Sequence, residues 1–341
     1  MKKRILALLI GTSLLASLAI GCNSATEQPD TAATDDGATA ADQADTATDT
    51  AADAASGGKY TIGVLMKDNS DTFVKNIADA ITAKGEELKD EVTLLMSDGE
   101  SNVEQQISQC EAFITQGVDA IILNAIDAEG CNPIVELCNE ANIPIIECNT
   151  LTSNTDYTCY VGSDDVEAGK IMGDFLITRL ADDAKVCILE GPMGQSGQIK
   201  RNQGIYESLI DKTNIEVLQI QTANWKRDVA LSLSEDWLTR YPSGQLDAII
   251  CENDDMALGA LEAVSAAGRK DEILIVGVDA ISDALTAVEN GGMDCTVFQD
   301  SKGQAEAAVE VALQAAKGET IDKEVMIPFV LVTKENVAEY K

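Results

Sequence analysis

Hydrophobic positions in residues 59–341 alternate between two periods. Short apolar runs such as Tyr60–Met66 and Ala120–Leu123 have the length and composition of buried strands. The segments between such runs are longer, and their apolar residues recur every three or four positions, as in 71–88 and 103–116. Strands that alternate with helices of this length predict βαβ units and a parallel sheet that is covered on both faces.

The same alternation continues to the end of the chain and restarts after residue 161. The expected strands cover 60–66, 91–96, 120–123, 144–148, 158–161, 185–189, 215–220, 247–251, 273–276 and 293–298. The expected helices cover 71–88, 103–116, 133–141, 166–180, 199–210, 227–240, 256–266, 281–289 and 304–316. A body of this length with a restart in its pattern favours an α/β fold of two doubly wound parallel-sheet lobes.

The two expected lobes exchange chain segments. We expect crossings near Ser163, Gln299 and Pro328, so that the N-terminal lobe comprises 59–163 plus 300–327 and the C-terminal lobe comprises 164–299 plus 328–341. Several crossing segments form a hinge, and a hinge between two lobes produces a cleft that can close.

Polar residues gather where an expected strand passes into its helix. Asn253, Asp254 and Asp255 stand between the apolar run that ends at Cys251 and the helix that starts at Met256. Asn253 offers both a donor and an acceptor, and Asp254 can serve as the helix N-cap. Capping alone would explain this fragment. Because open α/β sheets bind ligands at the carboxyl ends of their strands, recurrence of the arrangement along the chain favours a ligand site.

The N-terminus has the layout of a secretory signal. Three basic residues precede an apolar run over 5–20, and Leu18–Cys22 resembles a bacterial lipobox, in which the cysteine is lipidated after cleavage. Ala19 stands where a larger aliphatic residue is usual. A transmembrane anchor is the alternative, although the run is at the short edge for a span. We therefore expect residues 1–22 to be a signal peptide and lipobox, with Cys22 as the lipidation site.

Residues 23–58 have the composition of a spacer. They contain no aromatic residue and no Leu, Ile or Val, and they carry eight acidic residues and no basic one. Such a segment cannot bury enough apolar area to offset the entropy lost on ordering. The sequence predicts a disordered acidic linker between a lipid anchor and the folded body.

Composition excludes several function classes. The formal net charge of −34 at pH 7 is opposite to the basic footprint that nucleic-acid binding requires. The absence of histidine rules out Ser-His-Asp and Cys-His catalysis and every histidine-based zinc site. The eight cysteines after Cys22 form no Cys-x-x-Cys motif. Disulfides are possible in an exported chain, but this spacing favours buried free thiols that act as small hydrophobic residues.

Two motifs invite comparison with phosphate and metal sites. The loop Gly191–Gly197 follows a strand and precedes a helix, yet it matches neither of the common phosphate-binding patterns. We interpret it as a turn that brings Arg201 toward the cleft; the alternative for Arg201 is a solvated helix charge. Three acidic pairs lack the spacing of a calcium loop and are interpreted as caps and solvated turns: Asp164-Asp165, Asp182-Asp183 and Asp254-Asp255.

Phe73 and Trp225 each stand just beyond an expected strand, one in each half of a chain with 4% aromatic residues. Core packing is the default for a single aromatic side chain. A matched pair at equivalent loops favours a different role, in which two rings sandwich the apolar faces of a flat ligand while carboxylates and amides contact its rim.

Several of these stretches together resemble the periplasmic binding proteins of the ribose and galactose/glucose type, the sugar-capturing components of ABC importers. The resemblance covers nearly all of 59–341 and implies two lobes joined by three crossovers. It rests on Ile62-Gly-Val64 with Asp71-x-Phe73, and on Leu94–Asp98, Tyr160–Asp164, Thr222–Trp225, Glu252–Ala260 and Val276–Ala280.

The resemblance also implies a binding site. Phe73 and Trp225 would be the ring-stacking pair. Carboxylate, amide and guanidinium groups pair well with sugar hydroxyls. The groups implied for that role are Asp71, Asn124, Asn149, Arg201, Asn253, Asp279 and Gln299.

This chain departs from the family pattern at several positions. Asn149-Thr150 replaces the Asp-Arg of ribose binders, and Gln195 and Gly197 replace the His and Asp of galactose/glucose binders. The calcium loop of the galactose type has no counterpart near 181–185. Asp71, Trp225 and the run Val278–Ile281 nevertheless favour a hexose such as galactose or glucose, with ribose as a possible ligand.

We therefore expect an extracytoplasmic, lipid-anchored, monomeric solute-binding protein that captures a monosaccharide. It would deliver this ligand to the transmembrane subunits of an ABC permease. We expect no enzymatic activity, cofactor, metal or nucleic acid, and membrane contact through the lipid anchor only. One alternative is a sensor that presents the sugar to a chemoreceptor or sensor kinase. Another is a glycosidase with Asp71 and Asp279 as its acid and base.

Overall fold

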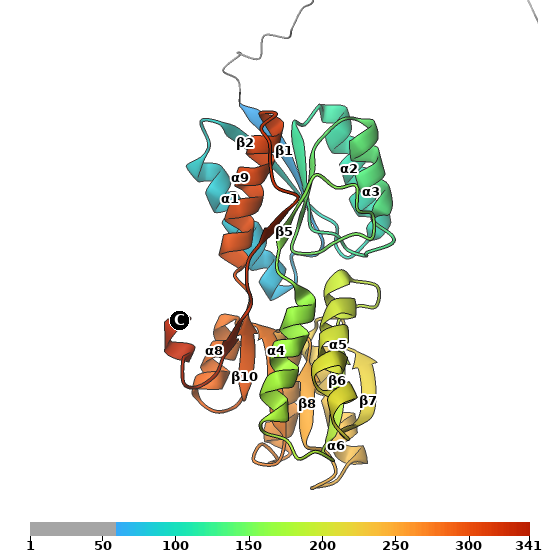
Figure 1. Cartoon of the computed structure of the whole chain (residues 1–341), viewed down its shortest axis with the longest axis vertical. Coiled ribbons are helices and arrows are strands. Elements are labelled where there is room, and N and C mark those ends of the chain that lie inside the picture. The colour runs from blue at the N-terminus through green and yellow to red at the C-terminus, as the bar shows by residue number, and fades with distance from the viewer. Residues whose placement is uncertain (1–58) are drawn as a thin grey trace, which may run out of the picture. The chain divides into compact units, whose positions relative to one another are not determined.

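The computed structural model describes residues 59–341, which form two parallel-sheet lobes with helices on both faces of each sheet (Figure 1). The expected signal peptide and lipobox at 1–22, with the lipidation site Cys22, and the linker at 23–58 lie outside the described residues. Within 59–341, none of the helices combines the length and the apolar character that a membrane crossing requires.

The first sheet has the strand order β11-β5-β4-β3-β1-β2, and its strands are parallel. Its strands are β1 (Tyr60–Met66), β2 (Val92–Asp98), β3 (Ala120–Leu123), β4 (Ile145–Cys148), β5 (Cys159–Gly162) and β11 (Glu324–Met326). The helices that cover it are α1 (Thr72–Glu87), α2 (Val103–Gln116), α3 (Asn132–Glu140) and α9 (Ser301–Ala316). Helices α1 and α9 lie side by side over one face, and α2 and α3 cover the other (Figure 1).

The second sheet repeats this arrangement with the order β12-β10-β9-β8-β6-β7. Its strands are β6 (Lys185–Glu190), β7 (Glu216–Thr222), β8 (Ala248–Cys251), β9 (Leu274–Asp279), β10 (Cys295–Phe298) and β12 (Val330–Val332), of which β12 runs antiparallel to β10. Helices α4 (Asp165–Ile177) and α5 (Ser196–Ser208) cover one face. The other face carries α6 (Arg227–Arg240), α7 (Asp254–Ala266) and α8 (Ser282–Glu289).

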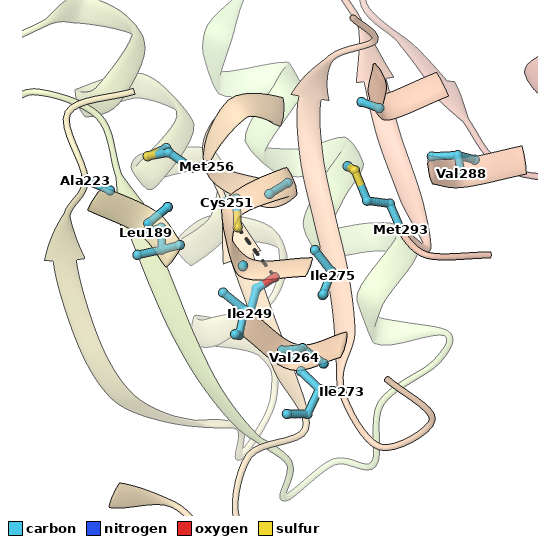
Figure 2. Packing of buried hydrophobic residues seen from close by; sticks show 14 of the residues in the cluster. Leu189, Ala223, Ile249, Cys251, Met256, Val264, Ile273, Ile275, Val288 and Met293 are labelled. Atoms are coloured by element: carbon cyan, nitrogen blue, oxygen red, sulfur yellow. Dashed lines mark hydrogen bonds between the residues drawn. The ribbon is translucent and has the colours of Figure 1, made fainter. Parts of the chain in front are cut away.

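Strand alternation divides each sheet between two cores. Along β1, Ile62, Val64 and Met66 pack under α1 and α9, whereas Leu65 packs with α2 and α3. Figure 2 shows one core of the second lobe, in which apolar side chains of β8 and β9 pack against α7. Burial on both faces explains why these strands read as continuous apolar runs in the sequence.

The predicted fold class is confirmed: two doubly wound lobes are joined by three crossovers. The chain passes from the first sheet to the second between β5 and α4, returns between β10 and α9, and crosses again between β11 and β12. One local expectation was wrong. Asn253, not Asp254, is the N-cap of α7, because the Asn253 side chain accepts a hydrogen bond from Met256 N, and Asp254 is the first helical residue.

The eight cysteines of the described chain are buried and form no disulfide, as the spacing favoured. Seven of the eight are fully buried in strands or helices, and the eighth, Cys131, is the residue immediately before α3. They therefore fill core volume as small apolar groups.

Two glycines set the distance between α4 and α5. A Cβ atom at Gly204 would lie 2.1 Å from Val166 O, and one at Gly169 would lie 2.2 Å from Arg201 O. The two helix backbones therefore touch without intervening side chains. Since the backbone of Arg201 is part of this contact, the packing of the two helices also fixes the position from which the Arg201 side chain extends.

We expect Gly204→Ala to lower the free energy of unfolding by about 1–3 kcal/mol, because the added methyl group has no space between the two backbones. Urea unfolding of the two proteins would measure this difference. The matched control is Gln203→Ala, which removes an exposed side chain one position earlier on the same helix. Equal midpoints for Gly204→Ala and Gln203→Ala would contradict the close helix contact.

Candidate ligand-binding cleft

A cavity lies between the two lobes, and its space, including the part that is open to solvent, is about 350 Å³. The residues that line it come from both sheets and stand mainly at the carboxyl ends of strands or the first turns of helices. Those of the first lobe are Lys67, Asp71, Phe73, Asn149 and Thr150, and those of the second are Asp165, Gln195, Gly197, Arg201, Trp225, Asn253 and Asp279. This is the position at which open α/β sheets bind their ligands.

Phe73 and Trp225 meet this cavity from opposite lobes. Each is more than 90% buried, with 7% of Phe73 and 9% of Trp225 exposed, and each also packs on the core of its own lobe. The Trp225 ring is held in place, because its Nε1 donates to Gln195 Oε1 at 2.9 Å and the backbone of Gly191 lies directly against the ring. The two rings can therefore act as fixed apolar walls.

The position of Phe73 follows from a helix cap. Asp71 precedes α1, and its Oδ1 accepts hydrogen bonds from Phe73 N at 2.9 Å and Val74 N at 3.1 Å. One carboxylate oxygen is thus engaged by the cap, and the Asp71 side chain also lines the cavity. Burial raises the pKa of Asp71, although the charge of Lys67 opposes this shift.

Arg201 is a buried anchor and not a solvated helix charge. Its Nε donates to Asp165 Oδ1 at 2.9 Å, its Nη1 to Glu252 O at 2.5 Å and its Nη2 to Gln299 Oε1 at 3.2 Å. Its Nη1 also lies 3.9 Å from Asp279 Oδ1. The fixed fork of donors holds the guanidinium at one orientation in the cavity wall.

Asp279 ends β9 in a strained backbone conformation, with φ at +122°. Its side chain is 6% exposed and lines the cavity. Burial raises the pKa of Asp279 well above the usual range, while Arg201 opposes the shift.

The acidic pairs differ in their roles. The expectation of caps and solvated turns was wrong for Asp165 and for Asp254, which are 3% and 0% exposed. Asp254 Oδ1 accepts from Thr296 Oγ1 at 2.7 Å and its Oδ2 from Ile281 N at 3.0 Å, and burial raises its pKa to about 8. Asp254 thereby braces the turn that carries Asp279.

The amide residues divide into lining and supporting groups. Asn149 and Asn253 line the cavity. Asn124 and Gln299 do not line the cavity, but each contacts a residue that does. Asn124 Nδ2 donates to Thr150 Oγ1 at 3.1 Å, and Gln299 accepts from Arg201.

Sequence reasoning did not assign five residues of the cavity wall to the site: Lys67, Thr150, Asp165, Gln195 and Gly197. A signal was present for Lys67, which directly follows β1 just as Asp279 ends β9. No comparable signal marks Asp165, because its burial depends on Arg201 from another helix.

Two doubly wound lobes around a polar cavity with aromatic walls define the periplasmic binding protein class. Residues 62–320 match the family model of the periplasmic binding protein domain, so the chain belongs to this family. The resemblance drawn from the motifs is confirmed at this level.

Curated relatives and solved structures agree with this assignment. The chain is 34% identical to a putative rhizopine-binding protein of Rhizobium meliloti, over 82% of this chain and 92% of the relative. It is 36% identical to a xylitol-binding protein of Mycolicibacterium smegmatis, over 72% and 70%. A solute-binding protein of an ABC transporter from Bacillus halodurans, solved with bound myo-inositol, has a TM-score of 0.80 and 36% identity and covers 84% of this chain and 98% of its own.

A buried carboxyl supports the loop that reaches from the first lobe to the second. Glu147 on β4 is 0% exposed, and it accepts hydrogen bonds from Thr152 N and from Thr152 Oγ1. The neighbouring Leu151 N donates to Ser196 Oγ at 2.9 Å across the cleft. Burial raises the pKa of Glu147 from 4.5 to about 7.

This shift makes stability depend on pH. The folded form holds the Glu147 proton more tightly than the unfolded form, so between about pH 4.5 and pH 7 this group alone is expected to lower the free energy of unfolding by about 1.4 kcal/mol per pH unit. We expect Glu147→Gln, whose amide oxygen can still accept from Thr152, to remove this contribution to the slope. Relative to wild type, the variant should gain about 3 kcal/mol between pH 4.5 and pH 8. The exposed Glu136→Gln is the control, and parallel pH profiles for wild type and Glu147→Gln would contradict the expectation.

Proposed function

We propose that this chain is an extracytoplasmic solute-binding protein that captures a neutral six-membered cyclic polyol, a cyclitol or a hexose, for an ABC permease. The observation that carries the proposal is the meeting of Phe73 and Trp225, from opposite lobes, at one cavity that also contains Asp71, Arg201 and Asp279. Aromatic walls suit the C–H faces of a ring, and the charged groups suit its hydroxyl rim.

The charges of the cavity favour an uncharged ligand. Three carboxyl groups and two cationic side chains line it, and Arg201 is already paired with Asp165. A hydroxyl group is both donor and acceptor, so one ring can serve carboxylate, amide and ammonium groups at once. A polyol that lacks one hydroxyl would leave a buried polar group without a partner, which gives strong discrimination.

The relatives support the ligand class. The Bacillus halodurans structure contains myo-inositol, and one relative is named for xylitol, so both support a polyol. Asp71, Trp225 and the run Val278–Ile281 still favour a hexose. A cyclitol and a hexopyranose both present a six-membered chair with equatorial and axial hydroxyls, and the proposal therefore names the ring class and not the individual compound.

In this proposal ligand binding closes the lobes and no bond is broken. The ligand contacts both lobes only in the closed form, so it favours that form by its differential affinity. A permease would recognise the closed protein, which Cys22 would anchor to the membrane as a lipoprotein. A glycosidase would need Asp71 and Asp279 as a free acid–base pair, whereas Asp71 Oδ1 is engaged by the α1 backbone.

Titration calorimetry of residues 23–341 against myo-inositol, D-galactose, D-glucose, D-ribose and xylitol tests the proposal. We expect saturable binding of at least one six-membered ring, accompanied by a change in tryptophan fluorescence because Trp225 forms a cavity wall. A flat titration for every compound would refute it, and binding of only ribose or xylitol would refute the ring preference.

We expect Asp279→Ala to weaken binding of that ligand by about 100-fold or more, because a buried carboxylate that serves hydroxyl groups is lost. Calorimetry measures the change, and circular dichroism confirms that the fold is kept. The control is Asp283→Ala, which removes an exposed carboxylate on α8. Equal affinities of the two variants would show that Asp279 does not contact the ligand.

A further inference from the structure

Two buried thiols meet in the core of the first lobe. Cys110 lies on α2 and Cys138 on α3, and both are 0% exposed. Their Sγ atoms are 3.7 Å apart and share a hydrogen bond. Helices α2 and α3 lie side by side over one face of the sheet (Figure 1). The two sulfur atoms are therefore in direct contact, with no other side chain between them.

This contact sets the pair apart from the other cysteines. Within the described part of the chain, Cys110 and Cys138 are the one pair of thiols that share a hydrogen bond. Cys131, which lies in the same core, instead donates to Gln106 Oε1 at 3.3 Å. Core packing explains a cysteine that acts as a small apolar group, but it does not require that two sulfur atoms touch.

A disulfide bond between these two residues requires only a short movement. An S–S bond is about 2.05 Å long, so the two Sγ atoms must approach by roughly 1.7 Å from their present separation. Rotation of either side chain about χ1, together with a small shift of one helix along the other, supplies a movement of this size. No rearrangement of the sheet is needed.

The bond would close a ring that contains part of the cleft. The two cysteines are 28 positions apart, and β3 lies between them together with Asn124 and Ala128. Ala128 N donates to Gly194 O of the second lobe at 2.9 Å. A crosslink between α2 and α3 would therefore hold both ends of the segment through which the first lobe contacts this loop of the second.

The family to which the chain belongs works outside the reducing cytoplasm, where disulfides form and persist. We propose that Cys110 and Cys138 are a site of oxidative modification, at which a disulfide forms when the chain folds in the presence of an oxidant that is itself a disulfide. The inference is independent of the ligand that the cleft binds.

The reaction consists of two thiol–disulfide exchange steps. In the first step, the thiolate of one cysteine attacks the oxidant R–S–S–R, so that a mixed disulfide forms and one R–S⁻ leaves. In the second step, the thiolate of the other cysteine attacks the cysteine sulfur of the mixed disulfide, and the second R–S⁻ leaves. The cysteines lose two electrons to the oxidant, and their two protons are taken up by the released thiolates.

Folding is the stage at which this reaction can proceed. The hydrogen bond with Cys110 and burial both raise the pKa of the Cys138 thiol, whereas the thiolate is the reactive form. The completed core therefore slows both the formation and the reduction of the bond. Both thiols are accessible before α2 and α3 pack together.

Refolding of residues 23–341 from urea, in a buffer that contains reduced and oxidised glutathione, tests the inference. This chain lacks Cys22, so its thiols are the eight buried cysteines. Circular dichroism confirms refolding, and the remaining free thiols are then alkylated under denaturing conditions. We expect six of the eight cysteines to carry the label.

Digestion on the carboxyl side of glutamate identifies the pair. It places the three cysteines of this core in separate peptides, with Cys110 in 105–111, Cys131 in 130–136 and Cys138 in 137–140. We expect mass spectrometry to find 105–111 joined to 137–140, with a mass lower by two hydrogen atoms than the two peptides together.

Thermal unfolding provides a second measurement. A bond across a ring of this length constrains the unfolded chain, so wild type refolded in the oxidised state should melt about 5 °C or more above wild type refolded with dithiothreitol. Cys138→Ala should lose this difference between redox states. Cys148→Ala, the matched control, removes an equally buried thiol from β4 and should keep the difference. Each comparison is made within one protein, so a change in core volume does not affect it.

Three outcomes would overturn the inference. Eight labelled cysteines after refolding with oxidised glutathione would show that the two thiols only fill space. A bond from either peptide to 130–136 would assign the reactive pair to Cys131. Equal melting temperatures of oxidised and reduced wild type would show that the bond does not constrain the fold. A failure of every sugar to bind would alter none of these results, because no ligand enters the measurements.

Discussion

The buried guanidinium of Arg201 is the interaction on which the rest of the cleft depends. Its three hydrogen-bond partners are Asp165 in the first turn of α4, Glu252 O at the end of β8 and Gln299 at the crossover before α9. Asp165 follows the first crossover and Gln299 follows β10 at the second. The Arg201 guanidinium therefore links two hinge segments to the end of β8 in the cavity wall.

This arrangement explains why small residues are needed far from the cavity. The guanidinium reaches its three partners only if α5 lies close to α4, and Gly169 and Gly204 allow the two backbones to touch. Burying the cation without all its partners would cost several kcal/mol, of order 3–5 when one partner of a buried ion pair is removed. Helix packing, hinge position and site geometry are thus parts of one constraint.

The sequence predicted the elements that depend on local pattern, and it missed side chains whose burial depends on contact with another helix or lobe. Two-period alternation predicted the sheets, and the carboxyl end of a strand pointed to Asn253 because parallel topology brings strand ends to one edge. Asp71 and Asp279 were implied by the family resemblance, and all three line the cavity. Asp165 was interpreted as part of a cap or solvated turn, and Lys67 was not assigned to the site. They are buried only because a helix or a whole lobe covers them, and no local pattern encodes that. Asn124 and Gln299 follow the strand-end rule but serve as supports, because which atom a side chain offers depends on its neighbours.

Burial in the cleft acts against the charged forms of two of its lining residues. Asp279 and Lys67 both have pKa values shifted by burial in the directions that oppose their charges. Solvent can satisfy both groups when the lobes separate, and hydroxyl groups can satisfy both when a ligand is enclosed. In the proposed function, the same polar groups would select the ligand and oppose closure in its absence, so the shape of the protein would report whether ligand is bound.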